Sequence, residues 1–279
     1  MDRRSLLLRV LTAVVGIPLL LGAAWLGGWW WAFVVVALTA LAALEYVRLY
    51  PEMGSSSRWL FFAGLVLVLS SRWWARLLGD DRFIHSLLAF WVLGVSLPIY
   101  ITWILPVVFS GDPSRTFDSR RPGGVASWGF FYLGLPALTL LYWGFDARFP
   151  AIVWLFAVIW TNDIAAYFVG HALGRHKLAP LLSPAKSWEG AAAGLVAGVA
   201  TSIGLGSWLS VAPLQAAVAG AAVTAASQLG DLFESAIKRR AGVKDSGVIF
   251  PGHGGVLDRF DGVFAAAPVA YLLLQWWAR

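Results

Sequence analysis

A polar segment in the C-terminal half of the chain, residues 238–262, gathers side chains that suit phosphate chemistry. It reads KRRAGVKDSGVIFPGHGGVLDRFDG and contains three aspartates, a histidine, several glycines and five cationic residues: Lys238, Arg239, Arg240, Lys244 and Arg259. Cationic side chains neutralise phosphate charge, and glycines let the backbone approach a ligand closely or donate amides to it. This composition predicts a site for a polyphosphate held jointly by cations and a metal ion.

Acidic residues interrupt several segments that are otherwise apolar. They are Asp163, Asp231, Glu234 and Asp261. An unpaired charge inside a membrane helix costs at least ~2.5 kcal/mol, so such residues are functional candidates. Asp231 and Glu234 are three residues apart, and the same spacing joins Asp258 to Asp261. Each pair can therefore share a helix face, although simple pairing of one acid with a neighbouring base, such as Asp258 with Arg259, is the structural alternative.

The acids also indicate which metal would suit the site. Mg²⁺ is commonly bound by one or two carboxylates together with substrate phosphates, so it fits this composition better than zinc. His253 could suggest a zinc site, but the chain has no cysteine and the loop has no second histidine at ligand spacing. We therefore expect Mg²⁺, with a second cation as an option.

A second polar loop, residues 171–187, offers an anion site. Ser183 followed by Pro184 predicts a helix start, with serine as the cap and proline at the first helical position. Lys186 would lie in that first turn, and a helix N-terminus with a hydroxyl and a lysine attracts anions. An ordinary capped helix whose lysine reaches for lipid headgroups is the alternative.

The elements that position these residues must lie in a membrane. Of the 279 residues 59% are hydrophobic and 13% are charged, and 17 are tryptophan, which is typical of a polytopic membrane protein. The net charge is +6. In a membrane protein, an excess of basic residues first reflects the orientation of the chain in the bilayer and attraction to anionic lipid headgroups. We expect no nucleic-acid partner, because no soluble domain remains to bind one.

Apolar runs predict an all-α polytopic integral membrane protein with about nine transmembrane helices. The runs lie near residues 6–26, 28–47, 59–74, 84–106, 125–144, 150–170, 189–209, 213–237 and 262–277. We expect a single membrane domain, 1–279, with N-terminal helices in 1–148 and catalytic helices in 149–279.

The positive-inside rule sets the orientation. A cytoplasmic N-terminus places 16 of the 21 basic residues inside, together with the polar loops 171–187 and 238–260. The intramembrane acids then lie toward the cytoplasmic ends of the C-terminal helices. We therefore predict a multi-pass protein of the cell inner (cytoplasmic) membrane with its catalytic site facing the cytoplasm. Small residues on helix faces are compatible with a homodimer.

The same segments resemble a known family. Residues 235–261 match the signature of the phosphatidate cytidylyltransferases, also called CDP-diacylglycerol synthases, and residues 163–170, 183–190 and 228–235 are similar to the family as well. The resemblance covers about residues 160–262. Ala185 stands where the family often has a further lysine, and His171 where an arginine is common.

The resemblance implies a membrane enzyme that transfers a cytidylyl group from CTP to phosphatidic acid, giving CDP-diacylglycerol and pyrophosphate in phospholipid biosynthesis. It implies catalytic roles for Asp231, Asp258, Asp261, Lys238, Arg239, Lys244, His253 and Arg259. Asp231 and Asp258 would hold Mg²⁺, with Asp261 as a further ligand or as a partner of one.

Other residues have expected roles with the substrates. Ser183 and Lys186 would bind the nucleotide phosphates. Lys238, Arg239, Lys244 and Arg259 would divide between pyrophosphate and lipid phosphate. His253 would donate to the departing pyrophosphate or shape the loop, and Asp163 would be an outer ligand or a partner of an arginine. The alternative function is an ion-coupled secondary transporter, whose acids usually lie at the bilayer midplane within repeats.

Overall fold

Apolar runs become long helices in the computed structural model, which describes residues 3–71, 122–146, 148–250 and 254–277. The helices are α1 (Arg3–Leu26), α2 (Gly28–Leu49), α3 (Ser55–Leu69), α8 (Pro122–Phe145), α9 (Phe149–Leu173), α10 (Trp188–Gly206), α11 (Pro213–Arg240) and α12 (Leu257–Trp277). The bounds of each helix agree with those of one predicted apolar run to within a few residues, and the helices follow in the same order as the runs. The run at 84–106 lies outside the described residues, so the number nine stays a prediction.

Four of the described helices are long and apolar enough to cross a membrane. They span Gly28–Leu49, Phe149–Leu173, Trp188–Leu209 and Pro213–Arg240, the third including the short 3-10 helix η4 (Ser207–Leu209). Large apolar side chains also face outward, among them Trp25 and Phe33, each 73% exposed. An all-α fold with so apolar a surface is that of a polytopic membrane protein.

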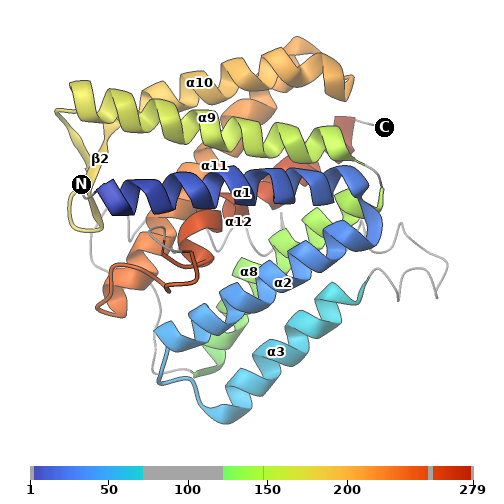
Figure 1. Ribbon diagram of the computed structural model, residues 1–279, viewed down its shortest axis with the longest axis vertical. Helices are drawn as coiled ribbons and strands as arrows, with labels where there is room; N and C mark the ends of the chain where they lie inside the picture. Colours follow the sequence, from blue (N-terminus) through green and yellow to red (C-terminus); the bar gives the residue numbers. More distant parts are fainter. Residues whose placement is uncertain (1–2, 72–121, 147, 251–253, 278–279) are drawn as a thin grey trace.

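Among the C-terminal helices, α10 runs along α9 at the edge of the molecule (Figure 1), and it also packs on α11, which packs on α12. Gly190, Gly194 and Gly198 are buried in α10. A methyl group at Gly194 would come within 3.0 Å of Asn162 in α9, and one at Gly198 would do the same to Thr224 in α11. These small residues therefore let three helices pack closely, as expected for helices in lipid.

The N-terminal helices α2 and α3 pack on α8, which in turn packs on α12. One apolar core joins α8, α9 and α12, and a second joins α2, α3 and α8 to the ends of α11 and α12. The second core brings the C-terminal end of α2 beside the start of α12. A residue of the N-terminal half can therefore reach the signature segment.

A small β-hairpin connects α9 to α10, where a helix start was predicted. Strands β1 (Lys177–Ala179) and β2 (Ser183–Ser187) pair antiparallel, so Ser183 and Pro184 lie in a strand and the predicted helix start there is wrong. The helix begins at Trp188, where the Ser187 hydroxyl accepts a hydrogen bond of 3.2 Å from the Gly190 amide. A second serine thus provides the cap, and strand pairing keeps the proline extended.

Candidate active site

The acidic residues gather where α9, α11 and α12 approach the hairpin. Asp163 comes from α9, Asp231 and Glu234 from α11, and Asp258 and Asp261 from the first two turns of α12. Leu182 of the hairpin turn packs against α11, which brings the hairpin to the same end of the molecule (Figure 1). Acids from three helices therefore lie near one another, as expected from the sequence. The role of each residue stays a prediction.

One group of these residues lines a cavity of about 490 Å³ between α9, α10, α11 and the hairpin. Lys186 of β2 forms an ion pair of 2.5 Å with Asp231, and both line the cavity with Asp163. The volume falls within the range of small-ligand pockets. A lysine at the wall of a pocket this size can bind the phosphates of a nucleotide.

Two amides that the sequence analysis did not single out orient the acid on α9. Gln228 donates to Asn162 at 2.8 Å and to the Ala191 carbonyl at 3.0 Å, and Asn162 donates to Asp163 at 2.9 Å. Asn162 is only 1% exposed. Polar amides inside apolar helices are costly unless bonded, and that criterion could have found both.

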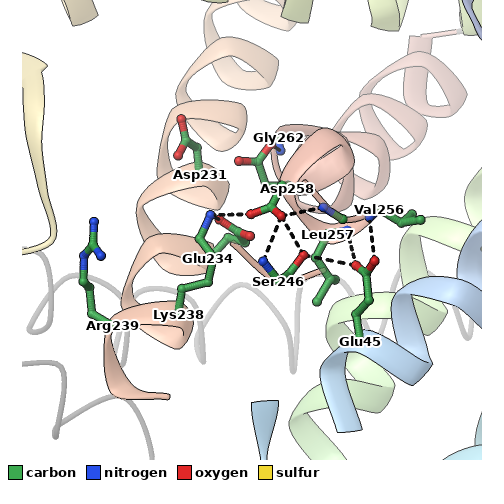
Figure 2. A network of polar contacts seen from close by, with 12 residues as sticks. Glu45, Asp231, Glu234, Lys238, Arg239, Ser246, Val256, Leu257, Asp258 and Gly262 are labelled. Carbon is green, nitrogen blue, oxygen red and sulfur yellow. Dashed lines mark hydrogen bonds and ion pairs between the residues drawn. The ribbon is translucent and has the colours of Figure 1, made fainter. Parts of the chain in front are cut away.

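A second group forms around Lys238, one helical turn beyond Glu234. The Lys238 ammonium lies 2.5 Å from a Glu234 oxygen and 2.6 Å from Asp258 Oδ1 (Figure 2). The side chains of the two acids are 2% and 4% exposed. Asp258 therefore pairs with the lysine of α11, and Lys238 is the one cation of a buried trio with two acids.

Backbone and hydroxyl groups hold the other oxygen of Asp258. Its Oδ2 accepts hydrogen bonds from the Ser246 amide at 2.8 Å, the Ser246 hydroxyl at 2.9 Å and the Gly255 amide at 2.7 Å. Asp258 lies in the first turn of α12, ahead of the apolar stretch 262–277. Burial tends to raise the pKa of this carboxyl, but the bonds from Lys238, Gly255 and Ser246 outweigh it and lower the pKa to about 2. Asp258 is thus fixed as a carboxylate.

The remaining predicted residues are less closely gathered. Arg239 points away from the acids (Figure 2) and donates to the Leu182 carbonyl at 3.3 Å, so it ties α11 to the hairpin. Lys244 and Arg259 are exposed, and Ser183 is half-buried in β2. His253 lies outside the described residues, so its predicted role stays untested.

One further acid contacts this site, Glu45 of α2, which was not among the residues expected from the sequence. Its carboxylate accepts from the Val256 and Leu257 amides at 3.0 and 2.9 Å and from the Ser246 hydroxyl at 3.1 Å. Glu45 interrupts an apolar run, so the same rule that singled out the other intramembrane acids could have found it.

The acids suit a hard cation that is completed by substrate. Asp163, Asp231 and Asp261 lie close enough for their charges to interact, and the basic residues Lys186 and Arg259 are near enough to offset that charge. Within the described ranges, no three potential metal ligands converge on one point. Since Mg²⁺ takes few protein carboxylates and completes its shell with phosphates and water, these residues fit such an ion.

Comparison with known proteins agrees with this constellation. The sequence profile of the cytidylyltransferase family matches residues 7–277. The phosphatidate cytidylyltransferase of Brucella suis is 37% identical over 95% of this chain and 91% of its own length. Proteins of the same name from Pseudomonas aeruginosa, 34% identical over 97% and 96%, and from Synechocystis, 32% identical over 94% of each chain, are also similar. The chain therefore belongs to the cytidylyltransferase family.

Proposed function

We propose that this membrane enzyme is a phosphatidate cytidylyltransferase, which converts CTP and phosphatidic acid to CDP-diacylglycerol and pyrophosphate. The observation that supports it most is the ion pair of Asp231 with Lys186 in the wall of a cavity of about 490 Å³, together with the buried pair of Asp258 and Lys238. Relatives of matching length carry the name of this activity. None of the relatives cited is named a transporter, so we do not pursue that alternative.

The reaction requires that the two substrates be aligned and that the negative charge of their phosphates be neutralised. A phosphate oxygen of phosphatidic acid attacks the α-phosphorus of CTP, a new P–O bond forms, and the bond to the bridging oxygen of pyrophosphate breaks. The attacking oxygen is already anionic near pH 7, so no strong general base is required. Aligned reactants and preorganised charges account for most of the rate in such transfers.

The chain's own residues divide this work. Lys186, on the cavity wall, would bind nucleotide phosphates, and in doing so it would release Asp231 from its ion pair. Lys238 would hold Asp258 in place and offset the charge of the leaving pyrophosphate. Lys244 and Arg259, both exposed, would meet the lipid phosphate or the pyrophosphate, whereas Arg239 would keep the hairpin against α11.

Mg²⁺ would be held by Asp231, with Asp261 as a ligand or a partner of one, and a second cation is an option. Asp258, the other ligand expected from the sequence, would join them only by exchanging its bond to Lys238 for the ion. When bound, the ion would supply positive charge to the phosphates during transfer. Asp231, whose ion-pair partner in the described part of the chain is Lys186 of the cavity wall, is suited to take up such an ion together with a substrate phosphate.

We also infer where the enzyme works. Nine spans with a cytoplasmic N-terminus would place the site at the cytoplasmic face of the inner membrane, where soluble CTP meets phosphatidate in the leaflet. The expected partners are these two substrates and membrane lipid, with no nucleic acid, and the small-residue helix faces are compatible with a homodimer.

The position of the label in CTP tests the reaction directly. Purified protein in micelles containing phosphatidate should transfer ³²P from α-labelled CTP into chloroform-soluble lipid. The label of γ-labelled CTP should appear in water-soluble pyrophosphate. Diacylglycerol in place of phosphatidate should give no labelled lipid. Transfer of the γ label to lipid would indicate a kinase reaction and refute the proposal.

A further inference from the structure

Glu45 is a buried acid of the N-terminal half whose only described partners belong to the signature segment. It is 1% exposed, and more than 200 residues of sequence separate it from the groups that it contacts. Val256 donates its amide to one carboxylate oxygen, and Leu257 donates its amide to the other (Figure 2). These amides begin α12, so a side chain from α2 caps this helix.

The charge of Glu45 is balanced by that helix end. Among the described residues, no lysine, arginine or histidine forms an ion pair with it. Free amides and the partial positive charge of a helix N-terminus stabilise a carboxylate there. The cap therefore fixes the position of α12 relative to α2, and not merely the local conformation of the loop.

Two glycines of the signature segment make room for this carboxylate. A methyl group at Gly247 or at Gly255 would lie under 3.0 Å from Glu45 oxygens, and at Gly255 it would also meet the Ser246 hydroxyl. Gly255 has no side chain in the way, so its own amide can reach Asp258. The glycines that the sequence suggested for ligand approach thus serve a carboxylate of the protein itself.

Glu45 and Asp258 are held by the same short segment. The Ser246 hydroxyl lies 3.1 Å from Glu45 and 2.9 Å from Asp258, and its one proton can serve only one of them at a time. Residues 255–257 bond Asp258 at one end and Glu45 at the other. A displacement of Glu45 would therefore move the groups that aim Asp258.

We propose that Glu45 is a positioning residue of the transferase, which holds the start of α12 and Ser246 so that Asp258 faces Lys238. The inference rests on the proposed function for the role of Asp258. Glu45 touches no substrate in this scheme. It acts through the backbone that carries Asp258, and in this way the N-terminal helices take part in catalysis.

The test compares Glu45→Gln with wild-type protein and with Glu52→Gln, a matched control on an acid that is 40% exposed and 3.6 Å from Arg240. A glutamine keeps the size of the side chain but turns an NH₂ group toward a donor. We expect kcat of E45Q to fall about 10–100-fold, because a shift near 1 Å in a catalytic group costs about that much. The KM for CTP should stay within about twofold, and E52Q should match wild type.

Hydrogen exchange provides a readout that does not depend on the reaction. Amides in peptides covering 254–260 should exchange faster in E45Q than in wild type or E52Q, with peptides of α9 unchanged. A wild-type kcat in E45Q, unchanged exchange, or a loss of activity that only follows the folded fraction would each overturn the inference. If wild type itself makes no CDP-lipid, the proposed function fails while the exchange comparison still decides the role of Glu45.

Ser246→Ala is a milder variant for the case in which E45Q does not fold. It removes the shared hydroxyl and leaves the α12 amides on Glu45. We expect kcat to fall several-fold with the KM for CTP unchanged. A wild-type kcat in this variant would contradict the coupling of Glu45 to Asp258.

Discussion

Replacement of Lys238 by methionine should separate the structural and catalytic roles of the buried trio. Lys238 is the one cation between Glu234 and Asp258, at 2.5 and 2.6 Å, and its side chain is 15% exposed. Methionine keeps most of the length of the chain but leaves two buried carboxylates with no counter-charge. Loss of one partner of a buried ion pair costs about 3–5 kcal/mol.

Coulomb's law gives a cost of the same size. Two unit charges about 4 Å apart interact by about 4 kcal/mol at an effective dielectric constant near 20. Lys238→Met should therefore lower the free energy of unfolding by about 3–5 kcal/mol, seen as a lower melting temperature in detergent. Activity per folded molecule should also fall, because nothing then holds Asp258 Oδ1.

The double variant Lys238→Met with Glu234→Gln provides the control. Neutralising Glu234 removes one of the two uncompensated charges, so much of the lost stability should return while activity stays low. Folding measurements beside assays of CDP-lipid formation distinguish the two effects. A wild-type melting temperature in the single variant, or recovery of activity in the double variant, would refute this reading of the trio.

Three further outcomes follow from the site. Lys186→Met should raise the KM for CTP about tenfold or more with a smaller change in the KM for phosphatidate, and equal changes in both would argue against a nucleotide role for the residue that pairs with Asp231. Gly255→Ala should destabilise the protein by about 1–3 kcal/mol through overpacking against Glu45, whereas Gly54→Ala, with open space around it, should be neutral in the same melting experiment. Chelation by EDTA should abolish lipid labelling, and Mg²⁺ should restore it; full activity in EDTA would exclude the divalent cation.

The helices could be predicted from sequence because bilayer thickness requires long apolar runs, and each run in the described residues is a helix. The residue at which α10 begins could not be predicted in the same way. Ser183 and Pro184 carry the local signature of a helix start, but pairing of Ala179 with Ser183 keeps them in a strand and the cap passes to Ser187. Local signals decide such a boundary only where no tertiary contact competes.

The candidate acids were predictable because charge is rare and costly in an apolar helix. Their partners were not, since the sequence does not tell which lysine meets which acid across helices. Lys238 forms an ion pair with Asp258, and Lys186 forms one with Asp231. Arg239 instead donates a hydrogen bond to a backbone carbonyl, that of Leu182. The same rule could have singled out Glu45, but not its partners, because they lie more than 200 residues away and periodicity carries no information about such pairs.

The most direct test of the central claim is the rate of CDP-diacylglycerol formation by Asp258→Asn beside wild type. Both proteins would be assayed in phosphatidate micelles with CTP and Mg²⁺, and exposed Asp245→Asn of the same loop would serve as the control. Asparagine keeps the shape of the side chain and removes its charge from the bonds to Lys238, Ser246 and Gly255. We predict that folded D258N makes product at less than about 1% of the wild-type rate. A rate within twofold of wild type would contradict the assignment of this carboxylate site to cytidylyl transfer.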